Sequence, residues 1–175
     1  MDTRKARKKY KHIVANPFHV VWNELSRTQT QQLISVLCRE VNQQASNAKF
    51  QPELKRRHTE SSNINNFCQQ NMILGINNIA ENIESIECLV MLKSKENLAL
   101  LEPLFLLARS KGVYNITMSY EVAIQNLKEL TGVKKLAAFA LPKMNCFPMT
   151  FNLVKQFQLP NSRSFVPAQV KSVQI

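Results

Sequence analysis

The sequence contains little glycine and none of the cysteine spacings that bind zinc. Only three of the 175 residues are glycine, which excludes a glycine-rich phosphate-binding loop. The four cysteines lie far apart and form no C-x-x-C pair, so the sequence contains no zinc ribbon or zinc finger motif. We therefore expect neither a metal ion nor any other cofactor.

The sequence also lacks a long apolar run. Its most apolar stretch, residues 98–108, is interrupted by Glu102 and Pro103 and is too short to span a bilayer. The first residues are charged and no apolar segment follows them, so no secretory signal is visible. We expect an intracellular protein with no membrane partner, whose cysteines are reduced thiols.

No catalytic constellation is recognisable. The three histidines, His12, His19 and His58, all precede the apolar middle of the chain, and neither H-E-x-x-H nor G-x-S-x-G occurs. Aspartate occurs once, at Asp2. The glutamates of the middle are scattered as they are on solvated helix faces. We therefore expect no intrinsic catalysis.

Positive charge is what the chain has in excess. It carries 23 lysines and arginines against 12 acidic residues, a formal net charge of +11. This excess indicates a polyanionic partner, most simply nucleic acid. The charge is uneven: residues 1–66 carry 12 basic and 5 acidic residues, residues 67–142 carry 7 of each, and residues 143–175 carry 4 basic and no acidic residues. The positive charge therefore belongs to the flanks.

Three short segments in the neutral middle predict strands. Two are apolar runs, at residues 86–92 and 136–141, which are typical of strands buried on both faces. The third, at 114–118, alternates polar and apolar residues. Because helical patterns separate these segments, the sequence predicts an α/β fold, a three-layer α-β-α sandwich around a small mixed sheet.

The helical patterns lie between and before these strands. Apolar residues recur at helical spacing over 67–84, and we expect a break at Gly75 with a new helix after it. A second helix is expected after Ser94, either kinked or divided at Pro103. A third covers about 120–131 and ends at a glycine.

The flanks differ from this middle in composition. Residues 26–29 form a capping-box pattern (S-x-x-Q) followed by an apolar stripe, which predicts an N-terminal helix. The tail contains three prolines and no helical period, so we expect it to be extended. We divide the chain into a basic arm (1–15), an N-terminal helical extension (16–44), a polar linker (45–66), the α/β domain (67–142) and an extended basic tail (143–175).

Two clusters of basic residues are candidates for neutralising phosphates by counterion release. A nuclear-import signal or a solubilising tail is the alternative use of the same residues. The clusters are Arg4, Lys5, Arg7, Lys8, Lys9 and Lys11 in the arm, and Lys55, Arg56 and Arg57 in the linker.

Asparagine is frequent between Asn63 and Asn78 and offers many amide donors and acceptors. Composition alone would assign this run to a linker and a helix surface. Gly75, Asn77 and Asn78 stand at a predicted helix start, where free backbone N–H groups suit a phosphate. We take these three residues as candidate nucleic-acid contacts.

Read together, the segments of the middle resemble the kink-turn-binding ribosomal-protein superfamily. The resemblance is carried by the helix start Gly75–Glu81, the strand Cys88–Leu92 and the proline-led helix and strand start Leu104–Val113. It covers residues 67–141 in order. The resemblance implies a fold in which helices cover both faces of a small sheet.

The flanks are similar to one branch of this superfamily, the protein subunit of nuclear ribonuclease P and ribonuclease MRP. Tyr10–Phe18, with Trp22 just beyond, and the C-terminal Phe165–Val173 carry this similarity. It implies a non-catalytic, nuclear and nucleolar subunit that binds structured RNA and other subunits. The RNA of such particles removes the 5′ leaders of precursor tRNA, or processes ribosomal RNA.

At two positions the chain departs from the superfamily's RNA-contacting pattern. Asn78 stands where the pattern has Glu, and Glu81 replaces a basic residue. A negative charge at a phosphate-facing position adds repulsion. We therefore hypothesise that this face binds RNA weakly and that the arms and protein partners supply most of the anchoring. The alternatives are a ribosomal or small-nucleolar-particle RNA binder of the same fold, and a protein scaffold whose arms are import signals.

Apolar residues of the flanks are candidates for contacts with neighbouring subunits, because aromatic residues are enriched at interfaces. For Trp22 a place in the core is the favoured alternative. The candidates are Pro17, Phe18, Trp22, Phe165, Val166 and Val170.

Overall fold

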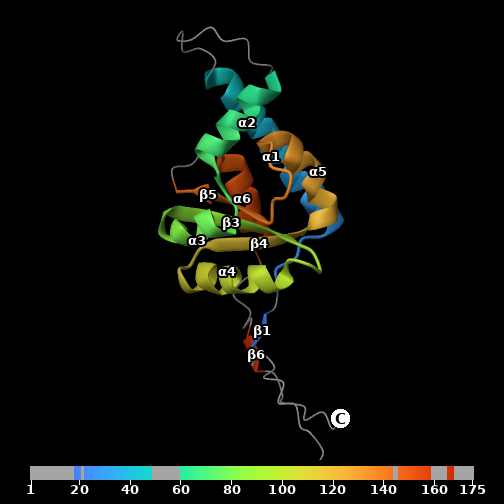
Figure 1. Cartoon of the computed structure of the whole chain (residues 1–175), viewed down its shortest axis with the longest axis vertical. Coiled ribbons are helices and arrows are strands. Elements are labelled where there is room, and N and C mark those ends of the chain that lie inside the picture. Colours follow the sequence, from blue (N-terminus) through green and yellow to red (C-terminus); the bar gives the residue numbers. More distant parts are fainter. Residues whose placement is uncertain (1–17, 21, 49–59, 144–145, 159–164, 168–175) are drawn as a thin grey trace, which may run out of the picture. The chain divides into compact units, whose positions relative to one another are not determined.

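The computed structural model describes residues 18–20, 22–48, 60–143, 146–158 and 165–167 (Figure 1). Residues 22–160 form one compact unit, and the segments on either side of it form a second. Within the second unit, strand β1 (Phe18–Val20) pairs antiparallel with strand β6 (Phe165–Pro167), with His19 opposite Val166. Two segments that the sequence assigned to partner contacts are therefore neighbours in one two-stranded ribbon.

The larger unit is built on a mixed sheet of four strands in the order β2-β5-β3-β4. Strands β3 and β4 are parallel, whereas β5 is antiparallel to both of its neighbours, β3 and β2. The strands are β2 (Ile73–Leu74), β3 (Ile86–Lys93), β4 (Tyr114–Ser119) and β5 (Ala138–Pro142).

Helices cover both faces of this sheet, as the sequence predicts (Figure 1). On one face lie α1 (Arg27–Ala48), α5 (Tyr120–Thr131) and α6 (Pro148–Phe157), with α2 (Glu60–Asn71) packed against α1 and α5. On the other lie α3 (Ile76–Glu81), the 3-10 helix η1 (Ile83–Ser85) and α4 (Leu98–Ser110). The fold is therefore α/β, with three layers.

The central strand β3 is buried on both faces, which explains its continuous apolar sequence. Cys88, Val90 and Leu92 are fully buried in the larger core, which α1, α2, α5 and α6 complete. Because successive side chains of a strand point to opposite faces, Leu89 and Met91 face α3 and α4, and they are equally buried.

Several sequence predictions are confirmed at the level of the element. Helix α5 has the predicted bounds, and Gly132 ends it with a φ of 71° in the left-handed region. Strands β3, β4 and β5 occupy the three predicted segments. Helix α4 runs as one helix through Pro103 rather than as two.

The prediction of a wholly extended tail is wrong. Residues 148–157 form helix α6, and Phe147, Phe151 and Val154 are buried in the main core. Their spacing of four and three residues is helical, and Pro148 stands at the start of the helix, where proline is tolerated because its missing N–H would have no partner. Pro148 is therefore a start signal and not a breaker.

The predicted polar linker is also shorter than expected. Helix α1 continues to Ala48 and helix α2 begins at Glu60, while residues 49–59 lie outside the described part of the chain. The helix predicted around Gly75 divides differently too, because the short strand β2 separates α2 from α3. The polar composition of residues 60–66 led to the prediction of a linker, whereas tertiary contacts hold these residues in helix α2.

Those contacts join α2 to the C-terminus of α5. With its amide nitrogen facing them, Asn65 donates to the carbonyl oxygens of Glu129 (3.0 Å) and Leu130 (2.9 Å). One turn later, Gln69 Nε2 donates to the carbonyl oxygen of Thr131 at 3.4 Å. These carbonyls belong to the last turn of α5, where no intrahelical N–H is available, so the amides of α2 satisfy them.

Candidate nucleic-acid interface

Gly75 links β2 to α3 and has a conformation that only glycine adopts readily. Its φ is 88° and its ψ is 151°. A Cβ built there would meet nothing within 4 Å, so the backbone angle, and not crowding, requires glycine. The Gly75 N–H donates to the carbonyl oxygen of Ala138 (3.0 Å), and its own carbonyl accepts from Ile79 (3.1 Å). The start of α3 is thereby fixed beside the first residue of β5.

The structure brings Gly75, Asn77 and Asn78 together at this helix start, as the sequence predicts. Asn77 is exposed. Asn78 is exposed too, but its Nδ2 donates to the carbonyl oxygen of Leu74 at 3.0 Å, so part of its amide already serves the fold. Glu81 is exposed at the end of the same helix, where it adds a negative charge to this face.

A depression of about 860 Å³ lies at the same end of the sheet. The parallel strands β3 and β4 end here, and β5 begins here at Ala138, whose carbonyl oxygen accepts from the Gly75 N–H. We call it the depression beside Gly75, although Gly75 itself does not line it. In open α/β sheets, ligands commonly bind beyond the carboxyl ends of the strands. The depression is lined by residues 93–97 and Leu100, by Ser119, Tyr120 and Glu121, by Lys135, Leu136 and Ala137, and by Glu24.

Charge in this depression is mixed. Its lining residues include three lysines, Lys93, Lys95 and Lys135, and three glutamates, Glu24, Glu96 and Glu121, so positive and negative residues are equal in number. Lys93 is further engaged with Glu24, at 2.6 Å. The depression is therefore lined by polar groups but has no net charge that would attract a polyanion strongly.

The loop that forms one wall of the depression is held by hydrogen bonds. The Ser94 N–H donates to Asn97 Oδ1 (2.8 Å), and the Asn97 N–H donates to Ser94 Oγ (3.3 Å). Asn97 Nδ2 also donates to the carbonyl oxygen of Leu92 at 2.6 Å. This reciprocal arrangement precedes α4 as a capping box precedes a helix. Lys95 and Glu96 are exposed on the loop it fixes.

All of the predicted basic contacts lie outside the described residues. These are the arm residues Arg4, Lys5, Arg7, Lys8, Lys9 and Lys11 and the linker residues Lys55, Arg56 and Arg57. The described residues carry 11 basic and 10 acidic side chains. The remainder of the chain carries 12 basic and 2 acidic side chains, and therefore +10 of the net charge of +11.

The asparagine-rich run is divided between structural and exposed positions. Asn65 binds the end of α5, as described above, and Asn71 Nδ2 donates to the carbonyl oxygen of Phe67 at 2.9 Å. Asn66 and Asn77 are exposed. Some of these asparagines therefore bind backbone carbonyl groups of helices, and only the others are exposed to a ligand.

Among the predicted partner contacts, Trp22 packs within the larger unit. Its ring lies 5.1 Å from that of Phe105 on α4, and the side chain is half-buried. The residues that follow it cover the free edge of β4: the Leu25 N–H donates to Thr117, and the Thr117 N–H donates to Asn23, both at 2.8 Å. Phe18, Phe165 and Val166 lie in the β1–β6 ribbon, whereas Pro17 and Val170 lie outside the described residues.

Sequence reasoning missed the lysines of the depression. Lys93 is the last residue of β3 and Lys95 follows it, while Lys135 precedes β5; both strands were predicted. Their positions at strand ends could have suggested a shared site, but only if the order of the strands in the sheet had been known. Only the order β5-β3-β4 shows that the three residues share one edge of the sheet.

The buried thiols offer no activated nucleophile. Burial raises the pKa of Cys68 to about 12, with a smaller contribution from nearby Cys38. Burial also raises the pKa of Cys88, which is inaccessible in the central strand. Both side chains are therefore neutral thiols near pH 7, whereas the thiolate is the reactive form.

The chain matches no protein-family model, and no curated protein is significantly similar to it. Among the described residues, no three histidine, cysteine, aspartate or glutamate side chains gather so that they could hold a metal ion. In the same part of the chain, no helix is both long enough and apolar enough to cross a membrane.

Proposed function

We propose that this protein is a non-catalytic, RNA-binding subunit of a nuclear ribonuclease P or ribonuclease MRP particle. Its body would brace the RNA and contact other subunits in the nucleus and nucleolus. The RNA component would cleave precursor tRNA or ribosomal RNA. The protein itself would supply no catalytic group.

The observation that supports this proposal most strongly is the order of elements in the α/β body. A glycine-led short helix, a buried central strand, a helix containing Pro103, a parallel strand, a helix closed by Gly132 and a last buried strand follow one another from Gly75 to Pro142. This is the order that the resemblance to the kink-turn-binding superfamily implies.

The distribution of charge supports the way in which the RNA would be held. The described body is nearly neutral, and the depression beside Gly75 holds as many glutamates as lysines. The flanking segments and the linker carry nearly all the net charge. Affinity for phosphates would therefore come mainly from these segments, and the body would set their position.

A salt titration tests this proposal. The purified full chain should bind a folded RNA with an affinity that falls steeply as salt rises, because each neutralised phosphate releases counterions. Replacing the six basic arm residues from Arg4 to Lys11 by glutamine should reduce that slope by several units. The control, Lys128→Gln with Lys134→Gln, removes two charges from the exposed surface of the body and should change the slope per removed charge far less.

Two further readouts separate the alternatives. The full chain incubated with precursor tRNA or with a folded RNA should leave both uncleaved. A kink-turn RNA should compete no better than another folded RNA of equal length, because Asn78 and Glu81 depart from the kink-turn pattern. Strong selectivity for the kink turn would favour a ribosomal or small-nucleolar role. An RNA affinity unchanged by the arm substitutions would favour a protein scaffold.

A further inference from the structure

A second depression, of about 340 Å³, lies at the opposite end of the sheet, where β3 and β4 begin. It is separate from the depression beside Gly75, and no residue lines both. Its volume is at the lower end of the range of roughly 300–1,000 Å³ that is typical of ligand pockets. The lining residues are Ile83, Glu84, Ile86, Glu87, Lys111, Gly112, Val113, Tyr114 and Lys143.

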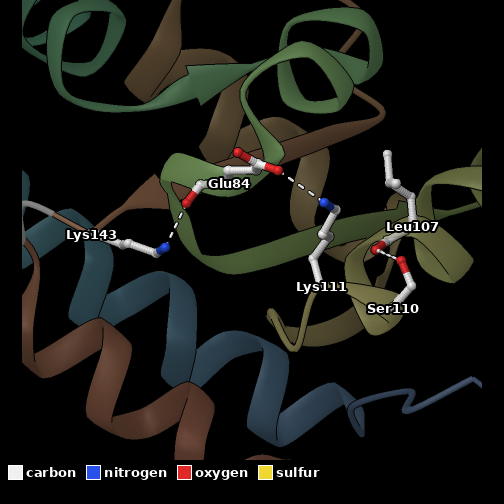
Figure 2. A network of polar contacts seen from close by, with 5 residues as sticks. All are labelled: Glu84, Leu107, Ser110, Lys111 and Lys143. Atoms are coloured by element: carbon white, nitrogen blue, oxygen red, sulfur yellow. Dashed lines mark hydrogen bonds and ion pairs between the residues drawn. The ribbon is translucent and has the colours of Figure 1, made fainter.

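Two glutamates, Glu84 and Glu87, and two lysines line this depression, and Glu84 holds both lysines. Figure 2 shows that the Glu84 carboxylate faces the ammonium of Lys111, at 2.9 Å, while its backbone carbonyl accepts from Lys143 Nζ at 2.5 Å. The hydrogen bond and charge of Lys111, with a smaller contribution from Lys143, lower the pKa of Glu84. The Lys111 side chain is still 45% exposed, so its ammonium remains open to a further anion.

Tyr114 forms the aromatic wall of the same depression, and it is 37% exposed. Its ring packs edge-on against Phe151 of α6, with the centroids 5.6 Å apart. A third lysine, Lys155, lies beside both rings, with its ammonium 4.2 Å from the centroid of Phe151 and 5.3 Å from that of Tyr114. The tyrosine ring is thus fixed in place between the depression and a positive charge.

We propose that this depression is a second RNA contact, which takes one unpaired nucleotide with its base against Tyr114 and its flanking phosphates near Lys143, Lys111 and Lys155. Aromatic rings set among lysines bind single-stranded nucleic acid in this way, because every base has a face that can stack while the cations follow the backbone. A duplex keeps its bases inside the stack and cannot offer one to the ring.

An acidic peptide would use the lysines but would gain little from an exposed ring in a depression of nucleotide size. The inference rests on the proposed RNA-binding function and adds the class of RNA that this end of the sheet would bind. An RNA that reached both ends of the sheet would be held by the body at two separate places. That geometry suits a protein that braces a folded RNA at a junction with unpaired nucleotides.

The test uses the full chain and two probes, a 12-nucleotide oligouridylate and a blunt RNA duplex of equal strand length. Tyr114→Leu keeps an apolar contact with Phe151 and removes the stacking face. It should weaken oligouridylate binding roughly 5- to 100-fold, the effect expected when one base–aromatic stack is removed. Binding of the duplex should change less than about twofold, since it places no base on Tyr114.

A charge-removal pair supplies the matched control. Lys143→Gln with Lys155→Gln should lower the salt slope for oligouridylate by about 0.7 for each phosphate that is no longer neutralised. Lys128→Gln with Lys134→Gln removes the same charge from exposed positions that line neither depression. This control pair should leave the slope nearly unchanged. Circular dichroism and thermal melting of each variant establish that it is folded.

Photo-crosslinking locates the contact directly. Oligouridylate that carries 4-thiouridine should crosslink to a peptide that contains Tyr114, as mapped by mass spectrometry. The inference is overturned if the wild-type chain binds oligouridylate and Tyr114→Leu binds it equally well, or if the crosslinks fall only on the depression beside Gly75. It is also overturned if Tyr114→Leu weakens binding of a polyglutamate peptide and not of the oligonucleotide. Failure of the wild-type chain to bind either RNA probe would overturn the proposed function as well.

Discussion

The carboxylate of Glu40 on α1 closes the first turn of α6 through Thr150. One carboxylate oxygen accepts from the Thr150 N–H at 2.8 Å and from the Thr150 hydroxyl at 2.5 Å, and the other accepts from the Met149 N–H at 2.6 Å. Glu40 is 4% exposed and Thr150 is fully buried. A negative charge at a helix N-terminus is favourable because the free N–H groups there point at it. This contact ties the C-terminal helix to α1 across 110 residues.

Glu40→Ala should destabilise the fold substantially. The substitution leaves two N–H groups and a hydroxyl without their acceptor in a buried place, and we expect a loss of about 2–4 kcal/mol in the free energy of unfolding. Urea unfolding followed by circular dichroism measures it. Glu96→Ala, at an exposed position of the loop before α4, is the control and should change the free energy by less than about 0.5 kcal/mol. A loss of that small size for Glu40→Ala would show that α6 does not depend on the carboxylate.

The amides of α2 should contribute to the stability of α5. Asn65→Ala removes the donor to the carbonyl oxygens of Glu129 and Leu130. Removal of a cap of this kind costs about 1–2 kcal/mol. Asn66→Ala is the matched control, because Asn66 is an exposed neighbour on the same helix. Equal unfolding free energies for the two variants would contradict the account of how α2 is held.

Gly75→Ala should cost stability through the backbone alone. Space for the methyl group is open, but a φ of 88° with a ψ of 151° is a strained conformation for alanine. We expect a loss of about 1–3 kcal/mol. Gly112→Asn is the comparison, because a φ of 69° lies in the left-handed region that asparagine tolerates. A Gly75→Ala variant as stable as the wild type would show that α3 can begin without this backbone angle.

The four thiols should react in an order set by burial. Under native conditions at pH 8, iodoacetamide should modify half-buried Cys146 first and Cys38 more slowly, because burial and the charge of Glu129 raise the pKa of Cys38. Cys68, with its pKa of about 12, and Cys88 should react only after unfolding. Mass spectrometry of timed samples gives the order. Early modification of Cys88 would mean that the central strand opens readily.

The body of the fold was predictable from the sequence where local pattern and tertiary environment agree. Residues 120–131 carry a clear apolar stripe and end at Gly132, so propensity and packing both favour the helix. Strand β3 was recognisable because burial on both faces demands a continuous apolar run.

The elements that were missed depend on distant partners, although for α6 the helical spacing of Phe147, Phe151 and Val154 was also a local signal. Helix α6 is capped by Glu40, and Phe147 just before it meets Phe67 of α2, with the ring centroids 6.1 Å apart. No local pattern at residues 143–160 reveals either partner. The two depressions could not be predicted either. Their lysines and Tyr114 are visible in the sequence, but the strand order that brings them together is not. The basic segments were recognised from composition alone, because the charge of a segment can be counted without knowing the fold.

The most direct measurement of the central claim is sequencing of the RNA that co-purifies with the tagged full chain from cells. The account predicts strong enrichment of the ribonuclease P or ribonuclease MRP RNA, and loss of that enrichment when the six basic residues from Arg4 to Lys11 are replaced by glutamine. Enrichment of ribosomal or small nucleolar RNA instead, or recovery of the chain without any structured RNA, would contradict it.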